Sequence, residues 1–187
     1  YGDFKPVVGA WAEYQITHKG EQPGKIRIAV VGKEGNDYWY ETVMEVKAEG
    51  RVISKMLVSG SPDSTSNVKR MIIKSGDEPA MEMPVQMMQM SAPARPEAKG
   101  KFMDKGTESV KVPAGTFKAR HLQYQDGAEA ADAWVQQDVA PYGLVKSSSK
   151  TSEMVLLGYG GGAKTMITET ARKFDMPQMP QMPQKRK

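Results

Sequence analysis

The sequence predicts a mainly β protein with an antiparallel sheet of about ten or eleven strands and one or two short helices. Three observations support this fold class. Apolar and polar residues alternate with period two along most of the chain. Turn residues such as Pro23-Gly24 recur between these segments at roughly the spacing of hairpins. No strong amphipathic helix separates successive strands, and parallel strands would need such crossovers.

The strand patterns assign faces as well as positions. Ala12, Tyr14 and Ile16 fall on one face of the first strand, and Tyr40 and Met44 share a face of the third. Strands are expected at 11–17, 26–30, 38–46, 52–58, 68–74, 107–112, 116–125, 131–137, 144–149, 153–157 and 166–174. Between the strands at 107–112 and 116–125, Pro113-Ala-Gly115 predicts a tight turn with Gly115 at positive φ.

Residues 77–96 break the strand pattern with four prolines and a run of methionines. Proline suits the first turn of a helix, so a short helix is expected to begin at or near Pro84. On that helix Met83, Met87 and Met90 would form one stripe, because residues three and four apart share a face.

A glycine-rich segment near the end of the chain resembles a phosphate-binding loop. Gly158, Lys164 and Thr165 match the Walker A pattern, but Ala163 replaces its last glycine. Such a loop needs a buried strand before it and a helix after it inside an α/β sheet, whereas the segment that follows is rich in β-branched residues. We therefore expect a flexible glycine-rich connection at 158–162 and no nucleotide.

Composition excludes several classes of site. The chain has no cysteine, which removes disulfides, thiolate metal sites and cysteine nucleophiles, and it has only two histidines, His18 and His121. Its net charge of +4 is spread over the chain, so nucleic acid is not an expected partner. No apolar run is long enough for a membrane span. We expect no enzyme activity and no cofactor.

The 14 methionines allow three interpretations. Methionine can fill an irregular core because its side chain adapts in shape. It can also form an apolar lid over a hydrophobic ligand. Thioethers are soft ligands for Cu(I), which makes a methionine-rich copper protein or metallochaperone the alternative function. The candidate Cu(I) ligands are Met81, Met83, Met87, Met88 and Met90.

Two stretches carry a family resemblance. The turn Val-Pro-Ala-Gly-Thr-Phe at 112–117, and the tryptophan strand leading to Pro-Tyr-Gly-Leu-Val-Lys at 141–146, resemble bacterial periplasmic proteins similar to the lipoprotein carriers of the LolA, LolB and LppX type. The opening Gly-Ala-Trp-Ala-Glu-Tyr at 9–14 fits the same pattern. The resemblance implies a curved, unclosed half-barrel whose concave face is covered by short helices and binds acyl chains or other lipids.

These observations give one functional hypothesis. The chain is expected to be an exported, periplasmic protein that binds a lipid or another hydrophobic molecule, with an envelope protein as a possible further partner. The absence of cysteine and a start at Tyr1 fit a protein whose signal peptide has been removed, although a shortened chain would also begin without methionine. Trp39, Trp134 and the stripe of Met83, Met87 and Met90 are the expected ligand-binding residues.

The chain is expected to divide into one half-barrel domain at 1–174 and a tail at 175–187. In the tail, proline stands at every third position of a Met-Pro-Gln repeat, followed by Lys185-Arg186-Lys187. Proline at this spacing removes backbone donors, so the tail cannot extend a central strand. A solvated arm that reaches a partner or an anionic membrane surface is the expected role.

Overall fold

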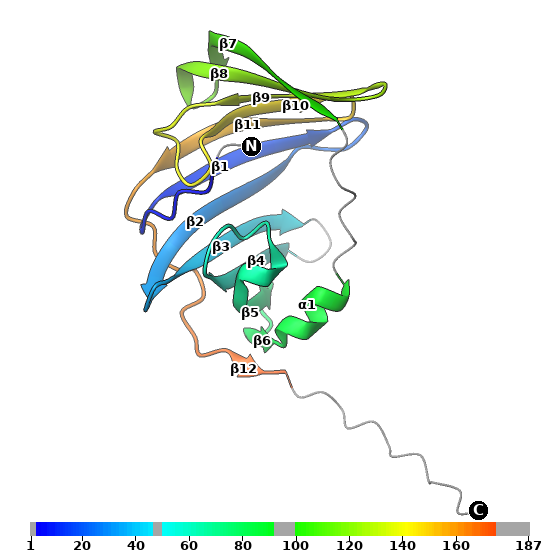
Figure 1. The fold of residues 1–187 in the computed structure, drawn as a ribbon. Helices are drawn as coiled ribbons and strands as arrows, with labels where there is room; N and C mark the ends of the chain where they lie inside the picture. The colour runs from blue at the N-terminus through cyan, green and yellow to red at the C-terminus, as the bar shows by residue number, and fades with distance from the viewer. Residues whose placement is uncertain (1–2, 47–49, 92–99, 175–187) are drawn as a thin grey trace, which may run out of the picture.

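A computed structural model of the chain describes residues 3–46, 50–91 and 100–174, and its strands form one open sheet of 12 strands (Figure 1). The strand order is β12-β6-β5-β4-β3-β2-β1-β11-β10-β9-β8-β7, and every neighbouring pair is antiparallel except β12 with β6. The sheet curves but does not close, because β12 and β7 remain at opposite edges. The expected mainly β, unclosed half-barrel is therefore confirmed.

Ten of the 12 strands agree with the expected segments, most with longer bounds; β6 was not expected, and β12 covers only the end of the expected segment 166–174. They are β1 (Trp11–His18), β2 (Gly24–Glu34), β3 (Asp37–Val46), β4 (Gly50–Val58), β5 (Val68–Ser75), β6 (Met81–Met83), β7 (Lys101–Val112), β8 (Gly115–Asp126), β9 (Glu129–Val135), β10 (Leu144–Ser149), β11 (Ser152–Gly160) and β12 (Arg172–Lys173). A single turn of 3₁₀ helix, η1 (Thr65–Asn67), precedes β5. The one α-helix of the described residues, α1 (Val85–Ser91), begins directly after Pro84 as expected.

The first and the eleventh strands form the seam of the sheet. β1 pairs with β2 on one side and with β11 on the other, so the sheet has one arm of β2 to β6 and a second arm of β7 to β10. The Tyr14 hydroxyl donates to the Leu144 carbonyl oxygen at 2.9 Å, which ties β1 to β10 across β11. The predicted turn between β7 and β8 also forms, and Gly115 there has a φ of 135°.

One face of the sheet, which we call the inner face, carries the main core. Ala12, Tyr14, Ile28 and Tyr40 are buried there, on the same faces that the period-two pattern assigns to them. The connection between β9 and β10 folds onto this core and buries Val139. The core also contains Val58, Val68, Val112, Ala119, Leu144, Val145 and Leu156.

An aromatic cluster joins the N-terminal segment, β3 and the β9–β10 connection at the inner face. The ring of Phe4 lies 5.8 Å from that of Tyr40 and 5.4 Å from that of Tyr142. Tyr40 and Tyr142 meet edge to face at 6.2 Å, a favoured geometry for aromatic pairs. This cluster and the β9–β10 connection fill the inner face near the seam.

A second, smaller core lies on the outer face of β3 to β5. Val43, Ile53 and Ile72 are buried there together with Ile167. Ile167 belongs to residues 161–174, which follow β11 and which we call the strap; Figure 1 shows it running down to β12. The expected strand at 166–174 is therefore wrong for most of its length, because this segment crosses the sheet and pairs with β6 only through β12.

The strap is held by a buried carboxylate. Glu41 on β3 is only 1% exposed and accepts hydrogen bonds from the Thr165 hydroxyl at 2.5 Å and from the Met166 backbone N–H at 3.0 Å. At the other end of the strap, the Glu169 carboxylate accepts from Lys74 at 2.6 Å and from the Ala80 N–H at 2.9 Å. These contacts satisfy polar groups that the small outer core would otherwise leave unpaired.

The glycine-rich segment is largely a strand. Gly158 and Gly160 belong to β11, where the flat ring of Trp11 lies over both: a Cβ at Gly160 would stand 3.2 Å from its indole nitrogen. The indole N–H donates to the Gly161 carbonyl oxygen at 3.2 Å. The expected flexible connection at 158–162 is thus wrong for its first half, because glycine there admits an aromatic ring.

Candidate ligand-binding face

The inner face of β2 to β6 carries a row of thioethers that the strand register brings together. Met56 on β4 stands directly opposite Met71 on β5, and Met71 stands directly opposite Met83 on β6. Directly opposite residues on neighbouring antiparallel strands point to the same side of the sheet. We call Met56, Met71 and Met83 the methionine row; Tyr40 on β3 precedes it, since Tyr40 pairs with Met56.

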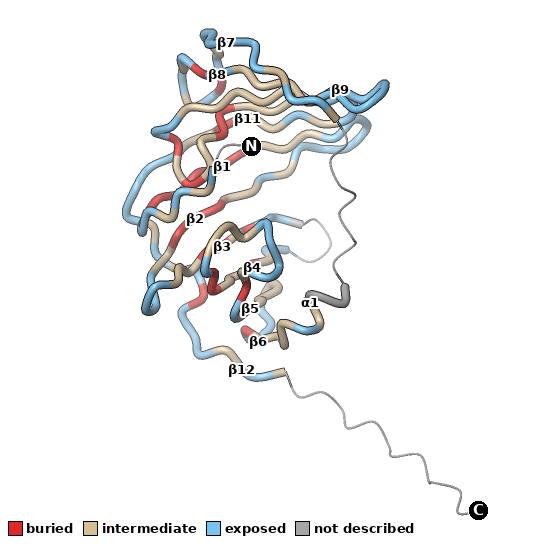
Figure 2. The backbone as a smooth tube through the Cα atoms, viewed as in Figure 1, coloured by how far each residue is buried: buried red, intermediate tan, exposed pale blue. Residues whose placement is uncertain are grey.

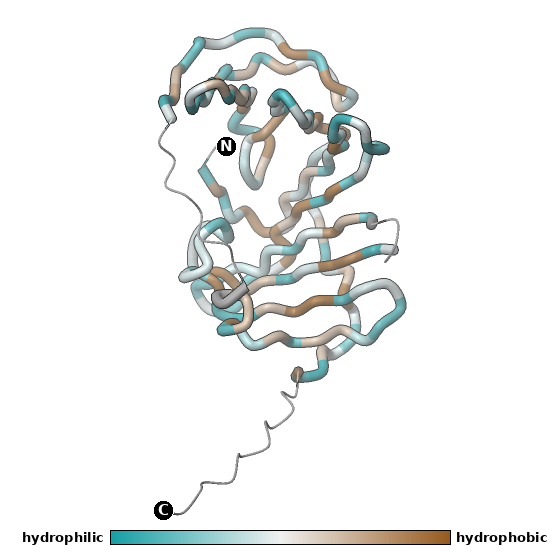
Figure 3. Tube along the Cα trace, turned by 90° about the vertical axis from the view of Figure 1, so that its right-hand side faces the viewer, coloured by the Kyte–Doolittle hydropathy of each residue, from teal (hydrophilic) through white to brown (hydrophobic). Residues whose placement is uncertain are grey.

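Further apolar side chains follow on the same face. A second row consists of Ile28, Thr42, Ser54, Ile73 and Met81, and a third of Ile26, Met44, Val52 and Ser75. In Figure 3, hydrophobic segments of successive strands lie side by side in the arm formed by β2 to β6. The inner face of this arm is therefore mostly apolar, with a few hydroxyl groups.

Helix α1 follows β6 and contacts β5. Met88 on this helix packs against the main core, and Met87 is partly buried. The expected helical stripe does not form as predicted, because Met83 lies in β6 rather than on the helix. Met87 and the backbone of Met90 do lie in the helix, and the Met90 side chain lies outside the described residues. The expected Cu(I) ligands Met81, Met83, Met87 and Met88 all belong to the β6–α1 segment beside the inner face.

Exposure separates the two faces of these strands. On the outer face Ile53 and Ile72 are 4% and 7% exposed, whereas their inner-face neighbours Ser54 and Ile73 are only partly buried and Met44 is 42% exposed. Figure 2 shows buried and partly buried positions alternating along this arm. The inner face of β3 to β6 is thus an incompletely covered apolar surface, which is the usual mark of a binding site.

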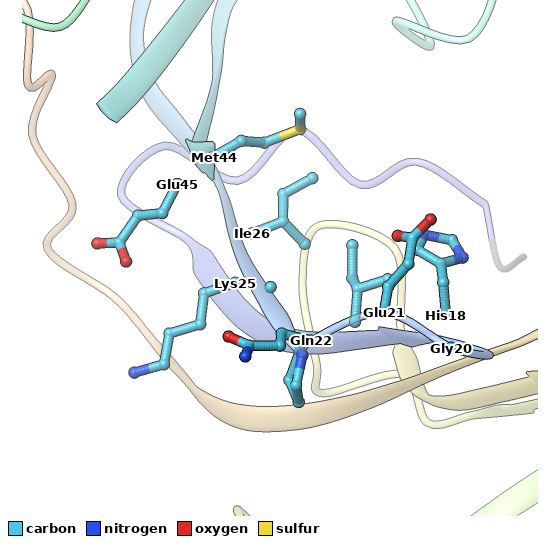
Figure 4. Close-up of a pocket in the computed structure, with 11 residues that line it drawn as sticks. His18, Gly20, Glu21, Gln22, Lys25, Ile26, Met44 and Glu45 are labelled. Carbon is cyan, nitrogen blue, oxygen red and sulfur yellow. The ribbon is translucent and has the colours of Figure 1, made fainter. Parts of the chain in front are cut away.

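A cavity of about 580 Å³ opens on this face at the end of β1, β2 and β3 (Figure 4). Ile16, Ile26 and Met44 supply its apolar wall. Its polar rim comes from the turn between β1 and β2, with His18, Glu21 and Lys25. Figure 4 shows Ile26 and Met44 next to each other, with Lys25 and Glu45 directed away from them. An apolar wall with a small number of polar groups at its mouth suits an amphiphile.

The tryptophans expected to line the site lie on the other face. Trp39 alternates with Tyr38 and Tyr40 and packs against the outer core, and Lys55 and Arg70 lie over its ring at 4.8 and 5.2 Å. Trp134 stands directly opposite Lys146, Lys146 opposite Val155, and Val155 opposite Gln15. Trp134 therefore lies on the same face of the sheet as Gln15 and Trp11. The structure therefore does not bring Trp39 or Trp134 together with the methionine row.

Trp134 belongs to a separate polar cluster. Its ring stacks on His121 at 4.5 Å, and His121 lies between Asp132 at 2.7 Å and Glu108 at 3.1 Å. The Trp134 indole also donates to Glu108. Each of these polar groups has a partner within the cluster. We therefore interpret the cluster as a structural network. Among the described residues, no group of three or more His, Asp or Glu is arranged to hold a metal ion.

The titratable groups nearest the inner face are phenols. Burial raises the pKa values of Tyr14 and Tyr40, so both hydroxyls remain protonated and uncharged at neutral pH. Burial also raises the pKa of Tyr142. Lys55, on the outer face, has its pKa lowered by burial, against the opposing effect of the Glu41 carboxylate. These phenols therefore add no charge to the inner face, and the charged groups of the site lie at the mouth of the cavity.

Sequence reasoning missed Met44, Met56 and Met71 as site residues. They lie far apart in the sequence, and only the register of three hairpins aligns them. The face on which Trp39 lies could be predicted from the sequence, because period-two alternation places it opposite to Tyr38 and Tyr40. Within the described parts of the chain, no helix has the length and apolar character that a membrane span requires.

Comparison with known proteins supports the fold. No family model matches the chain, and no curated protein matches it in sequence. The crystal structure of MucB in complex with MucA(peri) superposes with a TM-score of 0.51 at 8% identity, covering 88% of this chain and 54% of MucB. A second crystal structure of MucB gives a TM-score of 0.49 at 10% identity, with coverages of 84% and 55%.

A protein with a YmcC-like fold from Bacteroides fragilis is similar at a TM-score of 0.43 and 11% identity, covering 86% of this chain and all of that one. The chain spans about half the length of MucB. At such low identities the likeness is one of fold alone.

Proposed function

We propose that this chain is a non-enzymatic, exported protein that binds a hydrophobic ligand, a lipid or an acyl chain, on the inner face of β2 to β6. The observation that carries the proposal is the series of apolar rows on the inner face, which are only partly covered and adjoin a cavity of about 580 Å³. A cavity of this size lies within the usual range for small-molecule pockets.

The cavity and the methionine row have complementary roles in this proposal. Ile16, Ile26 and Met44 would contact one end of an extended chain, and the rows toward β6 would contact the rest. Methionine suits such a surface because its unbranched side chain can repack around ligands of different shape. The proposed contacts therefore include Met83 and Met87 from the expected stripe, but they replace Trp39 and Trp134 with Met44, Met56 and Met71.

Two further observations support an exported carrier with this role. The motifs at 112–117 and 141–146 resemble those of periplasmic proteins similar to lipoprotein carriers. MucB, whose fold is similar, was crystallised with the protein MucA(peri), so a protein partner is a reasonable addition to the proposal. Residues 1–174 would form the binding domain, and 175–187 an arm that reaches the partner or an anionic membrane surface.

Two exposed methionines on opposite faces provide a matched test. Met44 on the inner face is 42% exposed, and Met166 in the strap is 38% exposed. Replacing each with glutamine keeps the approximate size but adds an amide, which costs about 0.5–2 kcal/mol to bury against an apolar ligand. Binding of a fluorescent fatty acid should therefore weaken roughly twofold to thirtyfold in Met44→Gln and remain unchanged in Met166→Gln.

Native mass spectrometry of the purified protein gives an independent readout, since a tightly held lipid should appear as an added mass. Equal binding of the fatty acid by the Met44→Gln and Met166→Gln variants would show that the ligand does not bind on the inner face. A parent protein that neither carries lipid nor binds the fatty acid would refute the proposed function.

A further inference from the structure

The methionine row has a second chemical property besides being apolar. Met56, Met71 and Met83 are consecutive partners across three strands and are all partly buried, which leaves them in contact with the core yet accessible. Directly opposite Cβ atoms in an antiparallel sheet lie about 4.5–5.5 Å apart. Met56 and Met83 flank Met71 and lie two strand spacings apart, about 9–10 Å. Each methionine has three rotatable side-chain bonds, so the outer two sulfur atoms can turn inward toward that of Met71.

The surroundings of the row favour a soft ion over a hard one. Charged residues of the same strands, among them Lys55, Arg70 and Glu82, alternate with the row and lie on the outer face, where Arg70 and Glu82 pair at 2.7 Å. Carboxylates and imidazoles, which suit Zn²⁺ and harder cations, do not alternate into the row. The chain also has no cysteine that could compete for a soft ion.

The outer face of the same strands provides a comparison, because its apolar residues serve only to pack the core. There, β3, β4 and β5 place Val43, Ile53 and Ile72, three β-branched residues with defined shapes. On the inner face of β4, β5 and β6, the corresponding row consists entirely of thioethers. Packing alone does not require sulfur at three successive positions, whereas a soft metal ion does.

We propose that Met56, Met71 and Met83 form an all-thioether site for a soft monovalent metal ion, Cu(I) or its analogue Ag(I). Three thioether ligands match the preference of Cu(I) for soft donors. The site differs from the one expected from sequence, which used Met81, Met83, Met87, Met88 and Met90: it draws its ligands from three strands rather than from one segment. It goes beyond the proposed lipid binding and does not depend on it.

Cu(I) transfer from a chromophoric Cu(I) chelator, under anaerobic reducing conditions, measures the affinity of the full-length chain. The tail methionines Met176, Met179 and Met182 are replaced by leucine in every protein compared, because they could bind copper on their own. In this background the parent should bind one equivalent of Cu(I). Leucine at Met56, Met71 and Met83 together should lower the affinity at least about tenfold, because leucine keeps the volume but removes the sulfur.

The matched control replaces Met87, Met88 and Met90 with leucine and should leave the Cu(I) affinity unchanged. Met44→Gln, which lies outside the row, should also leave the Cu(I) affinity unchanged, and this separates failure of the metal site from failure of the ligand proposal. A loss of copper in the helix variant but not in the row variant would overturn the proposal, as would a parent that takes no copper from the chelator.

The pH dependence of the Cu(I) affinity distinguishes a thioether site from one that uses histidine or carboxylate ligands. Thioethers carry no proton to lose, so the Cu(I) affinity should be the same at pH 5 and pH 7.5, after correction for the chelator. A site that used His18 or His121 would weaken markedly over this interval. A strong loss at pH 5 would therefore contradict an all-thioether site.

Discussion

The two faces of strands β3 to β5 are built from the same alternating sequence but end in different environments. On the outer face Val43, Ile53 and Ile72 are buried together with Ile167 of the strap. The inner face of the same arm is only partly covered, with Met44 still 42% exposed. The difference comes from residues 161–174, a segment distant in sequence. Alternation decides which residues share a face, and a distant segment decides which face becomes core.

Adjacent isoleucines on β5 measure this contrast most directly. Ile72 faces the strap and is 7% exposed, whereas Ile73 faces inward and is only partly buried. Replacing a buried isoleucine with alanine costs about 2–5 kcal/mol, because transfer and cavity terms add. In urea unfolding, we expect Ile72→Ala to lose that much free energy of unfolding. Ile73→Ala should lose roughly half as much or less.

The same pair should show the opposite order in binding. Ile73→Ala should weaken fatty-acid binding more than Ile72→Ala does, because only Ile73 lies on the proposed ligand surface. Equal destabilisation by the two variants would mean that both faces are equally packed, and the distinction between core and site on β5 would be lost.

The buried carboxylate of Glu41 is the second test, because it fixes the strap to the outer face. Glu41→Ala leaves the Met166 N–H and the Thr165 hydroxyl without their acceptor. An unsatisfied buried donor costs about 1–3 kcal/mol, so the variant should lose about that much free energy of unfolding. Thr165→Val removes only one of the two donors and should cost less. An unchanged stability in Glu41→Ala would show that the strap is held without this carboxylate.

Acid should loosen the other attachment of the strap. Hydrogen bonding from Lys74, followed by that from the Ala80 N–H, lowers the pKa of Glu169 below its ordinary value of 4.5. A carboxyl group whose pKa is lowered by folding stabilises the fold above pH 4.5 and loses this contribution as the pH falls through the lowered value.

Thermal unfolding should therefore show Glu169→Gln below the parent at pH 7, with the difference shrinking as the pH falls below about 4.5. Glu45→Gln is the control, since the Glu45 carboxylate is exposed and its nearest cation, on Arg51, is 3.8 Å away. A difference between Glu169→Gln and the parent that persists at pH 3 would show that the carboxylate contributes nothing through its charge.

Much of the sheet could be predicted from local sequence. Ten of its strands follow the period-two segments, and the faces assigned to Tyr14, Tyr40 and Met44 are the observed ones. These features are local consequences of alternating side chains and turn residues. Residues 166–174 show the limit: the β-branched residues there suggest a strand, yet the chain uses Ile167 to close a core on β3 to β5.

The candidate site was predictable only in part. The run at 81–90 drew attention to methionine, and Met83 does lie in the row. Its partners Met56 and Met71 stand alone in their strands, so no local motif marks them. Their alignment depends on the register of two hairpins, including an irregularity next to Leu57 that no simple alternation rule predicts. Sites made across strands are therefore harder to recognise than sites made along one segment.

The smallest expected effect comes from deleting residues 175–187, and it tests where the closed face ends. The last described contacts of the strap are the pairing of β12 with β6 and the bond from the Phe174 N–H to the Glu82 carbonyl oxygen at 3.0 Å. The Met-Pro-Gln repeat that follows lacks backbone donors at every third position and has little bulk to add to a core.

Deletion should therefore shift the Tm by no more than about 2 °C, below the shift that roughly 1 kcal/mol causes in a domain of this size. Differential scanning calorimetry of the two chains measures this shift. A larger loss would mean that the tail packs on the body, and a simultaneous gain in fatty-acid binding would place it on the inner face, in competition with the ligand.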